Sequence, residues 1–116
     1  MSALRGRTIA ATAWRGQLEA ALADVREDPG AEPVHRLRVA SERLKVWLTL
    51  SGDFALRREL SWLRSRAGRL RDLDVRLAME VPGPLAARWR AQRSAARRAL
   101  VAPLRSARVA KLLAAL

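Results

Sequence analysis

Residues 54–80, FALRRELSWLRSRAGRLRDLDVRLAME, decide the fold because they carry the most regular hydrophobic pattern in the chain. Apolar side chains recur there at spacings of three and four, at Leu56, Leu60, Leu63, Ala67, Leu70 and Leu77. That period is typical of an α-helix with one buried face. Asp74 takes the remaining position of this seam, where an unpaired carboxylate would be unfavourable. We therefore expect an arginine on a facing helix to pair with Asp74.

Turn-forming residues divide the rest of the chain into further helices. We expect helices near 2–27, 33–51, 54–80 and 84–102, and a short helix near 106–116. Gly52 is predicted to stop the second helix and Asp53 to cap the third. Pro103 is predicted to break or kink the fourth helix, and Ser106 to cap the last.

Two of these helices carry apolar stripes that match the seam of 54–80. The stripes are Ala11, Trp14, Leu18, Leu22 and Val25 in the first helix, and Leu85, Trp89, Ala96 and Leu100 in the fourth. Because the connections are short, neighbouring helices should run antiparallel. The prediction is a single all-α domain over 1–116, an antiparallel four-helix bundle with a short C-terminal helix.

Charge restricts the class of partner. The 116 residues carry a formal net charge of +12, and Lys45 and Lys111 are the only lysines. So large an imbalance favours a polyanion, which could be nucleic acid, polyphosphate or an anionic membrane; the alternative is a basic chain that is merely soluble. No stretch is apolar enough for a signal peptide or a membrane span, so we expect a cytoplasmic protein with no membrane partner.

The helix predicted around VHRLRVASERLKVWL (34–48) separates core from charge. At about 100° per residue, one face collects Val34, Leu37, Ser41, Leu44 and Leu48. The adjoining face collects His35, Arg38, Glu42, Lys45 and Thr49. Arg36 and Arg43 lie elsewhere, beside a second apolar strip of Val39, Val46 and Leu50.

Basic residues also form stripes on the next two helices. They are Arg57, Arg64 and Arg71 on the third helix, and Arg90, Arg93 and Arg97 on the fourth. We expect the three stripes to converge on one groove, whereas Arg58 and Arg76 lie on another face. The alternative is that each arginine only covers apolar surface with its aliphatic stem.

The residue types indicate a ligand rich in phosphate and free of bases. The basic stripes contain no aromatic residue for base stacking, and the chain has no Asn. One histidine and no cysteine do not make a usual zinc site. Asp72 and Asp74 face different ways on a helix, so arginine salt bridges suit both. We expect no metal, no cofactor and no catalysis; the alternative is an enzyme in which His35 is a phosphoacceptor or general base.

Two motifs resemble a known family. VHRLRVASERLKVWL is similar to the signature helix of CHAD, the conserved histidine α-helical domain, whose pattern runs roughly V-H-x-L-R-V-x-x-R-R-L-R. ELSWLRSRAGRLRDLDV (59–75) resembles the second block of that family, which ends in R-D-x-D-V. The tail ALVAPLRSARVAKLLAAL resembles the segment that closes a CHAD repeat. The resemblance implies two four-helix bundles about a basic channel that binds inorganic polyphosphate, and this chain has the length of one bundle.

The resemblance also implies site residues and partners. His35, Arg38, Lys45 and Arg71 would line the channel, and Arg43 matches a signature arginine although the helical face turns it away. With Arg64, Arg93 and Arg97 of the stripes, they make up the predicted polyphosphate-binding set. Glu42 stands where the family has an arginine, so it either weakens binding or pairs with Arg38 or Lys45.

The half length leads to the hypothesis of a homodimer that closes the channel, with association with polyphosphate granules. A lone half-open groove, a truncated chain and a non-specific nucleic-acid-binding protein stay open as alternatives.

Overall fold

The computed structural model describes the backbone of residues 2–116 and the side chains from residue 12 onward. It contains five helices, α1 (Ser2–Glu27), α2 (Ala31–Ser51), α3 (Phe54–Leu77), α4 (Gly83–Leu104) and α5 (Ala107–Ala115), and no strand within 2–116. The all-α prediction is confirmed. The third helix ends three residues before the expected position 80, and α2 begins two residues before the expected position 33.

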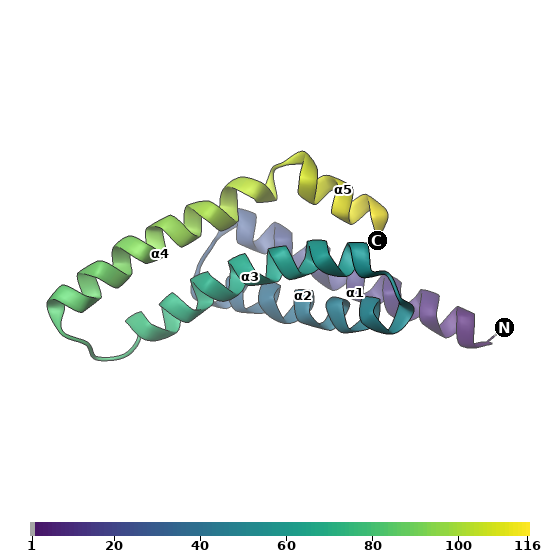
Figure 1. The fold of residues 1–116 in the computed structure, drawn as a ribbon, viewed down its shortest axis with the longest axis horizontal. Coiled ribbons are helices and arrows are strands. Elements are labelled where there is room, and N and C mark those ends of the chain that lie inside the picture. Colours follow the sequence, from purple (N-terminus) through teal and green to yellow (C-terminus); the bar gives the residue numbers. More distant parts are fainter. Residues whose placement is uncertain (1) are drawn as a thin grey trace.

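The helices form an elongated bundle of 59 × 27 × 23 Å (Figure 1). The central helix α3 packs against α2 on one side and α4 on the other, and α1 packs against α2. The end of α3 and the start of α4 form a hairpin that reaches beyond α1 and α2 at the left of Figure 1. The short α5 folds back over α3. The predicted antiparallel bundle with a short C-terminal helix is therefore what the chain forms.

The corner between α2 and α3 confirms both predicted end signals. Gly52 has a left-handed backbone, with φ of 80°, which costs glycine little because it has no Cβ. The Asp53 side chain accepts a hydrogen bond of 3.2 Å from the backbone N–H of Leu56, as an N-cap does.

Pro103 lies in the last turn of α4, which ends one residue later at Leu104 and two residues beyond the expected position 102. Proline has no N–H to donate to the carbonyl four residues back, which here belongs to Ala99. That carbonyl instead accepts a hydrogen bond of 3.0 Å from Nη1 of Arg66 on α3. Ser106 occupies the N-cap position of α5, but its hydroxyl donates to the carbonyl of Pro103 at 2.6 Å and makes no cap bond. Tertiary and local hydrogen bonds thus satisfy the carbonyls that end α4.

The core follows the hydrophobic periodicity. The buried apolar side chains are Leu18, Ala21, Leu22, Val25, Val34, Leu37, Ala40, Leu44, Leu48, Leu60, Leu63, Ala67, Leu70, Leu73, Ala96, Leu100, Leu104, Val109 and Leu112. In the seam of α3, Leu56 and Leu77 are only partly buried, and Ala11 of the first stripe lies outside the described side chains. Asp74 is partly buried, with only 8% of its side chain exposed, and forms an ion pair with Arg93 of α4. The expected arginine on a facing helix is therefore confirmed.

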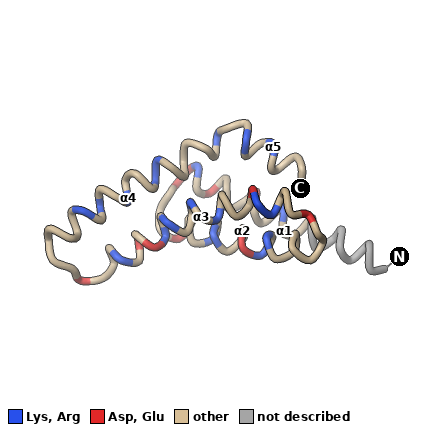
Figure 2. Tube along the Cα trace, viewed as in Figure 1, with Lys and Arg blue, Asp and Glu red and all other residues tan. Residues whose placement is uncertain are grey.

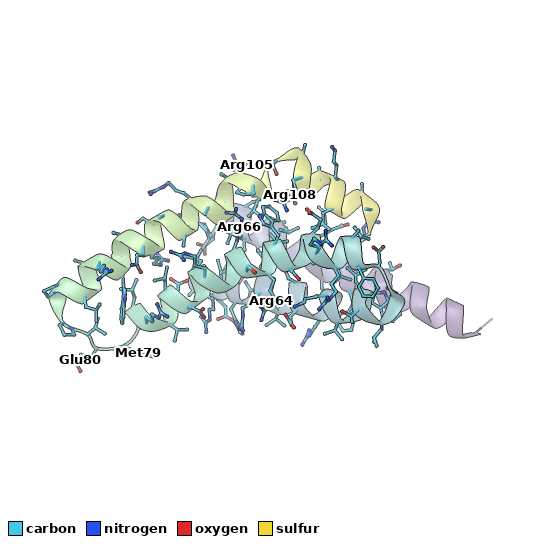
Figure 3. All side chains as sticks on the ribbon, in the orientation of Figure 1. Arg64, Arg66, Met79, Glu80, Arg105 and Arg108 are labelled. Carbon is cyan, nitrogen blue, oxygen red and sulfur yellow. The ribbon has the colours of Figure 1, made fainter. Side chains whose placement is uncertain are left out.

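Arginines also attach α5 to α3. Arg108 donates two hydrogen bonds to the Glu59 carboxylate, at 2.8 Å and 3.1 Å, and its guanidinium lies 3.6 Å from the centroid of the Trp62 ring. Arg66 approaches the same ring at 5.1 Å. Figure 3 shows Arg66 and Arg108 on the side of α4 and α5, whereas Arg64 lies toward α2. The hydrogen bond from Arg108 lowers the pKa of Glu59.

Candidate functional site

The outward face of α3 has a floor of small residues. At about 100° per residue, Ser61, Ser65 and Gly68 lie opposite the leucine seam and therefore away from the core. The Arg38 side chain of α2 reaches across toward this floor, where a Cβ added at Gly68 would lie 3.9 Å from Arg38 Nε. The missing side-chain volume leaves a hollow along the middle of α3.

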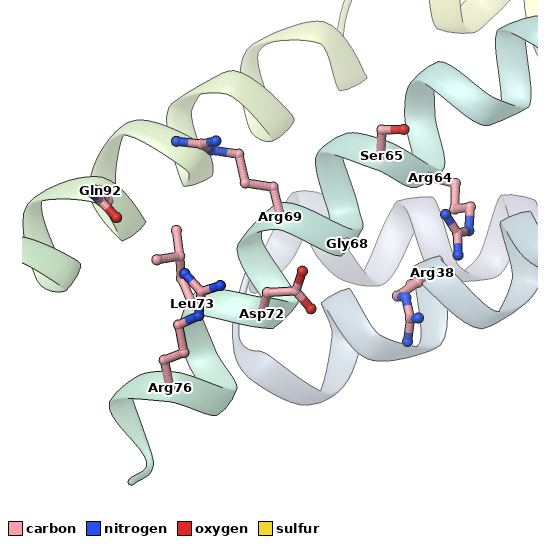
Figure 4. Close-up of a pocket in the computed structure, with 9 residues that line it drawn as sticks. All are labelled: Arg38, Arg64, Ser65, Gly68, Arg69, Asp72, Leu73, Arg76 and Gln92. Atoms are coloured by element: carbon pink, nitrogen blue, oxygen red, sulfur yellow. The ribbon is translucent and has the colours of Figure 1, made fainter. Parts of the chain in front are cut away.

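This hollow has a volume of about 540 Å³, and arginines from two helices line it (Figure 4). Arg38 comes from α2, and Arg64, Arg69 and Arg76 come from α3. Ser65 and Asp72 of α3 and Gln92 of α4 complete the polar lining. In Figure 4, Arg64 and Arg38 lie at one end, and Arg69 and Arg76 lie toward the other.

A narrower hollow of about 180 Å³ continues from the first between α2 and α3. It is lined by Arg38, Val39, Glu42, Arg43 and Arg64, so the two hollows share Arg38 and Arg64. We call the combined depression the arginine trough, defined by Arg38, Arg43, Arg64, Arg69 and Arg76.

Most of the positive charge in the trough is not neutralised by carboxylates. Among the described side chains, Arg38, Arg69 and Arg76 have no carboxylate oxygen within 4.0 Å, whereas Arg64 forms an ion pair with Glu42. Elsewhere Arg15, Arg93 and Arg108 are each paired with an acidic residue. Five arginines thus line the trough beside two carboxylates, Glu42 and Asp72, so its net charge attracts anions.

Three residues of the predicted binding set lie in the trough: Arg38, Arg43 and Arg64. Arg43 lines the narrow hollow beside Arg38, but its guanidinium is directed toward α1, where Nη1 donates a hydrogen bond of 3.5 Å to Gln17 Oε1. Its guanidinium also lies 5.8 Å from the Trp14 ring centroid of α1. Arg43 therefore sits where the surfaces of α1, α2 and α3 meet.

His35 is in a neighbouring hollow and not in the trough. This third hollow, of about 450 Å³, lies between α1 and α2 and is lined by residues that include Gln17, Asp24, His35 and Arg43. The Nδ1 atom of His35 is buried and makes no hydrogen bond to any described residue. Arg43 lines both hollows, so the histidine adjoins the trough.

The expected convergence of three basic stripes is not what the structure shows. Basic residues do recur along α2, α3 and α4 (Figure 2), but α4 gives the trough only Gln92. Arg93 is engaged by Asp74, and Arg97 is exposed. Lys45 and Arg71 do not line the trough either, and their roles in binding stay predictions, like those of Arg93 and Arg97.

Two arginines of the trough were not predicted from the sequence. Arg76 was expected on another face, and Arg69 was not singled out, yet both line the wide hollow. They are seven residues apart, like Arg57, Arg64 and Arg71, and form a second row along the other edge of the Ser65 and Gly68 floor. The signal was therefore a small-residue face with one arginine row on each side.

A metal site and a membrane-spanning helix are two other kinds of feature that could accompany the trough. Among the described residues no group of three or more His, Asp or Glu side chains could hold a metal ion, and no helix is long and apolar enough to cross a membrane. The positive charge that lines the trough would attract polyanions.

Residues 9–116 match the model of the CHAD domain family, so this chain belongs to that family. No curated protein and no solved structure matches the chain. The CHAD family is associated with polyphosphate binding in general.

Proposed function

We propose that the chain binds inorganic polyphosphate in the arginine trough. The observation that supports this most is the gathering of Arg38, Arg64, Arg69 and Arg76 around one hollow, three of them without a carboxylate partner among the side chains from residue 12 onward. A guanidinium presents its donors in a planar fork that grips two oxygens of one phosphate. The family association with polyphosphate supports the same ligand.

The dimensions of the trough favour an extended ligand. Arg64 and Arg76 are twelve residues apart on α3, which corresponds to about 18 Å at the rise of an α-helix. A single phosphate would reach only one end of the trough. A linear chain of phosphates would contact both ends and Arg38 at once.

Nucleic acid is the alternative ligand, bound without specificity through the same charge. No aromatic side chain lines the trough, and Gln92 is its only side-chain amide. Stacking on aromatic rings and amide contacts to base edges are the usual means of recognising bases. The lining therefore supports recognition of phosphate more than of bases.

Competition between two polyanions tests this choice. The chain is loaded with long-chain polyphosphate at about physiological ionic strength, and duplex DNA of equal phosphate concentration is added. We expect the polyphosphate to remain bound. Easy displacement by DNA would favour the non-specific nucleic-acid protein.

We further propose that a homodimer completes the site. The trough is open to solvent, and Val46 and Leu50 of α2, which line a further hollow with Glu42 and Arg43, are exposed at 53% and 77%, as is Phe54 of α3 at 62%. These residues continue the second apolar strip of α2 and offer a surface for a second copy. Solution mass with and without long-chain polyphosphate tests this, and a monomer under both conditions would contradict it.

The role we propose is binding without catalysis, in the cytoplasm and in association with polyphosphate granules. The only histidine of the sequence lines the neighbouring hollow between α1 and α2 and not the trough itself. An assay for phosphate released from polyphosphate checks this. Release that vanishes in a His35→Ala variant would overturn the non-catalytic role.

A further inference from the structure

One acidic side chain inside the trough already occupies an arginine. Glu42 of α2 and Arg64 of α3 form an ion pair across the two helices, and both line the narrow hollow with Arg38 and Arg43. The sequence suggested Arg38 or Lys45 of the same helix as the partner of Glu42, and the structure pairs it with Arg64 instead. The pair is partly exposed: 34% of the Arg64 side chain and 44% of the Glu42 side chain are accessible, although the contacting atoms, Arg64 Nε and Glu42 Oε2, are covered.

The exposure of this pair makes it replaceable. A partly exposed ion pair contributes little to folding, because water and salt screen it. The same carboxylate has a larger effect on a bound anion, because a second negative charge at Arg64 would be repelled by it. Arg64 is also shared between the wide and the narrow hollow. A ligand that follows the whole trough must therefore pass Glu42.

We propose that Glu42 is a resident competitor of the ligand, an internal anion that holds Arg64 while the trough is empty and leaves it when a phosphate binds there. This inference rests on the proposed polyphosphate function and names the residue that sets its affinity. When a phosphate replaces the Glu42 carboxylate on Arg64, the gain in binding free energy is smaller than when a phosphate binds a guanidinium that has no partner. The trough thus favours ligands that carry enough charge to gain contacts at Arg38, Arg69 and Arg76 as well.

The other carboxylate of the trough differs from Glu42 in this respect. Asp72 lines the wide hollow but is exposed, and within the described side chains no basic nitrogen lies within 4.0 Å of it. It therefore holds no single guanidinium that a ligand would have to take over. The competitor role belongs to Glu42 because only Glu42 is bound to a trough arginine.

The test compares Glu42→Gln with Glu19→Gln, which removes one negative charge from an exposed pair with Arg15 on α1. Equilibrium binding of long-chain polyphosphate is measured over a range of salt concentrations. We expect Glu42→Gln to raise the affinity about tenfold, equivalent to 1.4 kcal/mol. We also expect the slope of log affinity against log salt to steepen by about one charge, because one more phosphate is neutralised. Glu19→Gln should change the affinity less than about twofold.

A double-mutant cycle with Arg64→Ala separates competition from a general charge effect. In the Arg64→Ala background the gain from Glu42→Gln should shrink toward that of Glu19→Gln. Equal gains from Glu42→Gln and Glu19→Gln, or a gain that persists in full without Arg64, would overturn the inference and leave polyphosphate binding intact. Failure of the unaltered chain to bind polyphosphate would overturn the proposed function and this inference with it.

Discussion

The ion pair between Asp74 and Arg93 gives the sharpest prediction about stability. Replacing Arg93 with alanine leaves a carboxylate of which only 8% of the side chain is exposed, without its partner. Removing one member of a fully buried pair costs about 3–5 kcal/mol. Because 30% of the Arg93 side chain is exposed, we expect less here, about 2–3 kcal/mol. For a domain of this size that lowers the melting temperature by roughly 10 °C.

Urea unfolding followed by circular dichroism measures the change. Arg97→Ala is the matched control, because it removes the same charge from an exposed position one turn further along α4. We expect the control to lie within about 0.5 kcal/mol of the unaltered chain. The double variant Asp74→Leu, Arg93→Ala should recover part of the loss, since no buried charge then lacks a partner. Equal stabilities of Arg93→Ala and Arg97→Ala would refute the reasoning.

Three further predictions concern single positions. Gly52→Ala should lower the free energy of unfolding in urea by about 1 kcal/mol, because residue 52 has φ of 80°. An unchanged unfolding midpoint would contradict the left-handed conformation of residue 52. Gly68→Ala should stabilise α3 by about 0.5–1 kcal/mol because alanine favours a helix more than glycine does. The added Cβ would lie 3.9 Å from Arg38 Nε, so Arg38 should stay in place. A loss of polyphosphate binding would show that the trough has no room for this methyl group. The pKa of Glu59 is lowered by its hydrogen bond from Arg108, so its stabilising effect is present above the ordinary pKa of 4.5 and disappears as the pH falls through the lowered value. The melting temperatures of the unaltered chain and Glu59→Gln should therefore differ at pH 7 and converge in acid, and a gap that persists in acid would contradict this sign.

The periodic part of the fold could be predicted from the sequence because it depends on local rules. The seam around Leu60 and Leu63 is buried. Gly52 ends α2 with a left-handed backbone, and Asp53 starts α3 with a side-chain cap. The partner of Asp74 could be anticipated as a type of residue, since a carboxylate on a core face needs a cation. Which arginine would reach it depended on how α3 and α4 are aligned.

What was missed depends on contacts between helices. The carbonyl of Ala99, to which Pro103 cannot donate, accepts a hydrogen bond from Arg66 of another helix. The partner of Glu42 is Arg64 and not a neighbour on the same helix, because α2 and α3 bring the two side chains together.

The candidate site was predicted in part for the same reason. Arg38 and Arg64 were identified from their own helical faces, and both line the trough. Arg69 and Arg76 were not, because they form a separate row on the far side of Ser65 and Gly68 from the row that contains Arg64. The floor of Ser65 and Gly68 shows its importance only once α2 lies beside it and extends Arg38 toward it.

The most direct test of the trough compares two double variants that each remove two positive charges. Arg38→Ala, Arg76→Ala alters the trough, whereas Arg88→Ala, Arg98→Ala alters exposed positions on α4 that belong to no predicted binding set. Affinity for long-chain polyphosphate is measured against salt, with circular dichroism to confirm folding. We predict that the trough variant binds about a hundredfold more weakly and that its salt slope falls by about two charges, while the α4 variant stays within about threefold. Equal losses in the two variants would contradict a defined binding site.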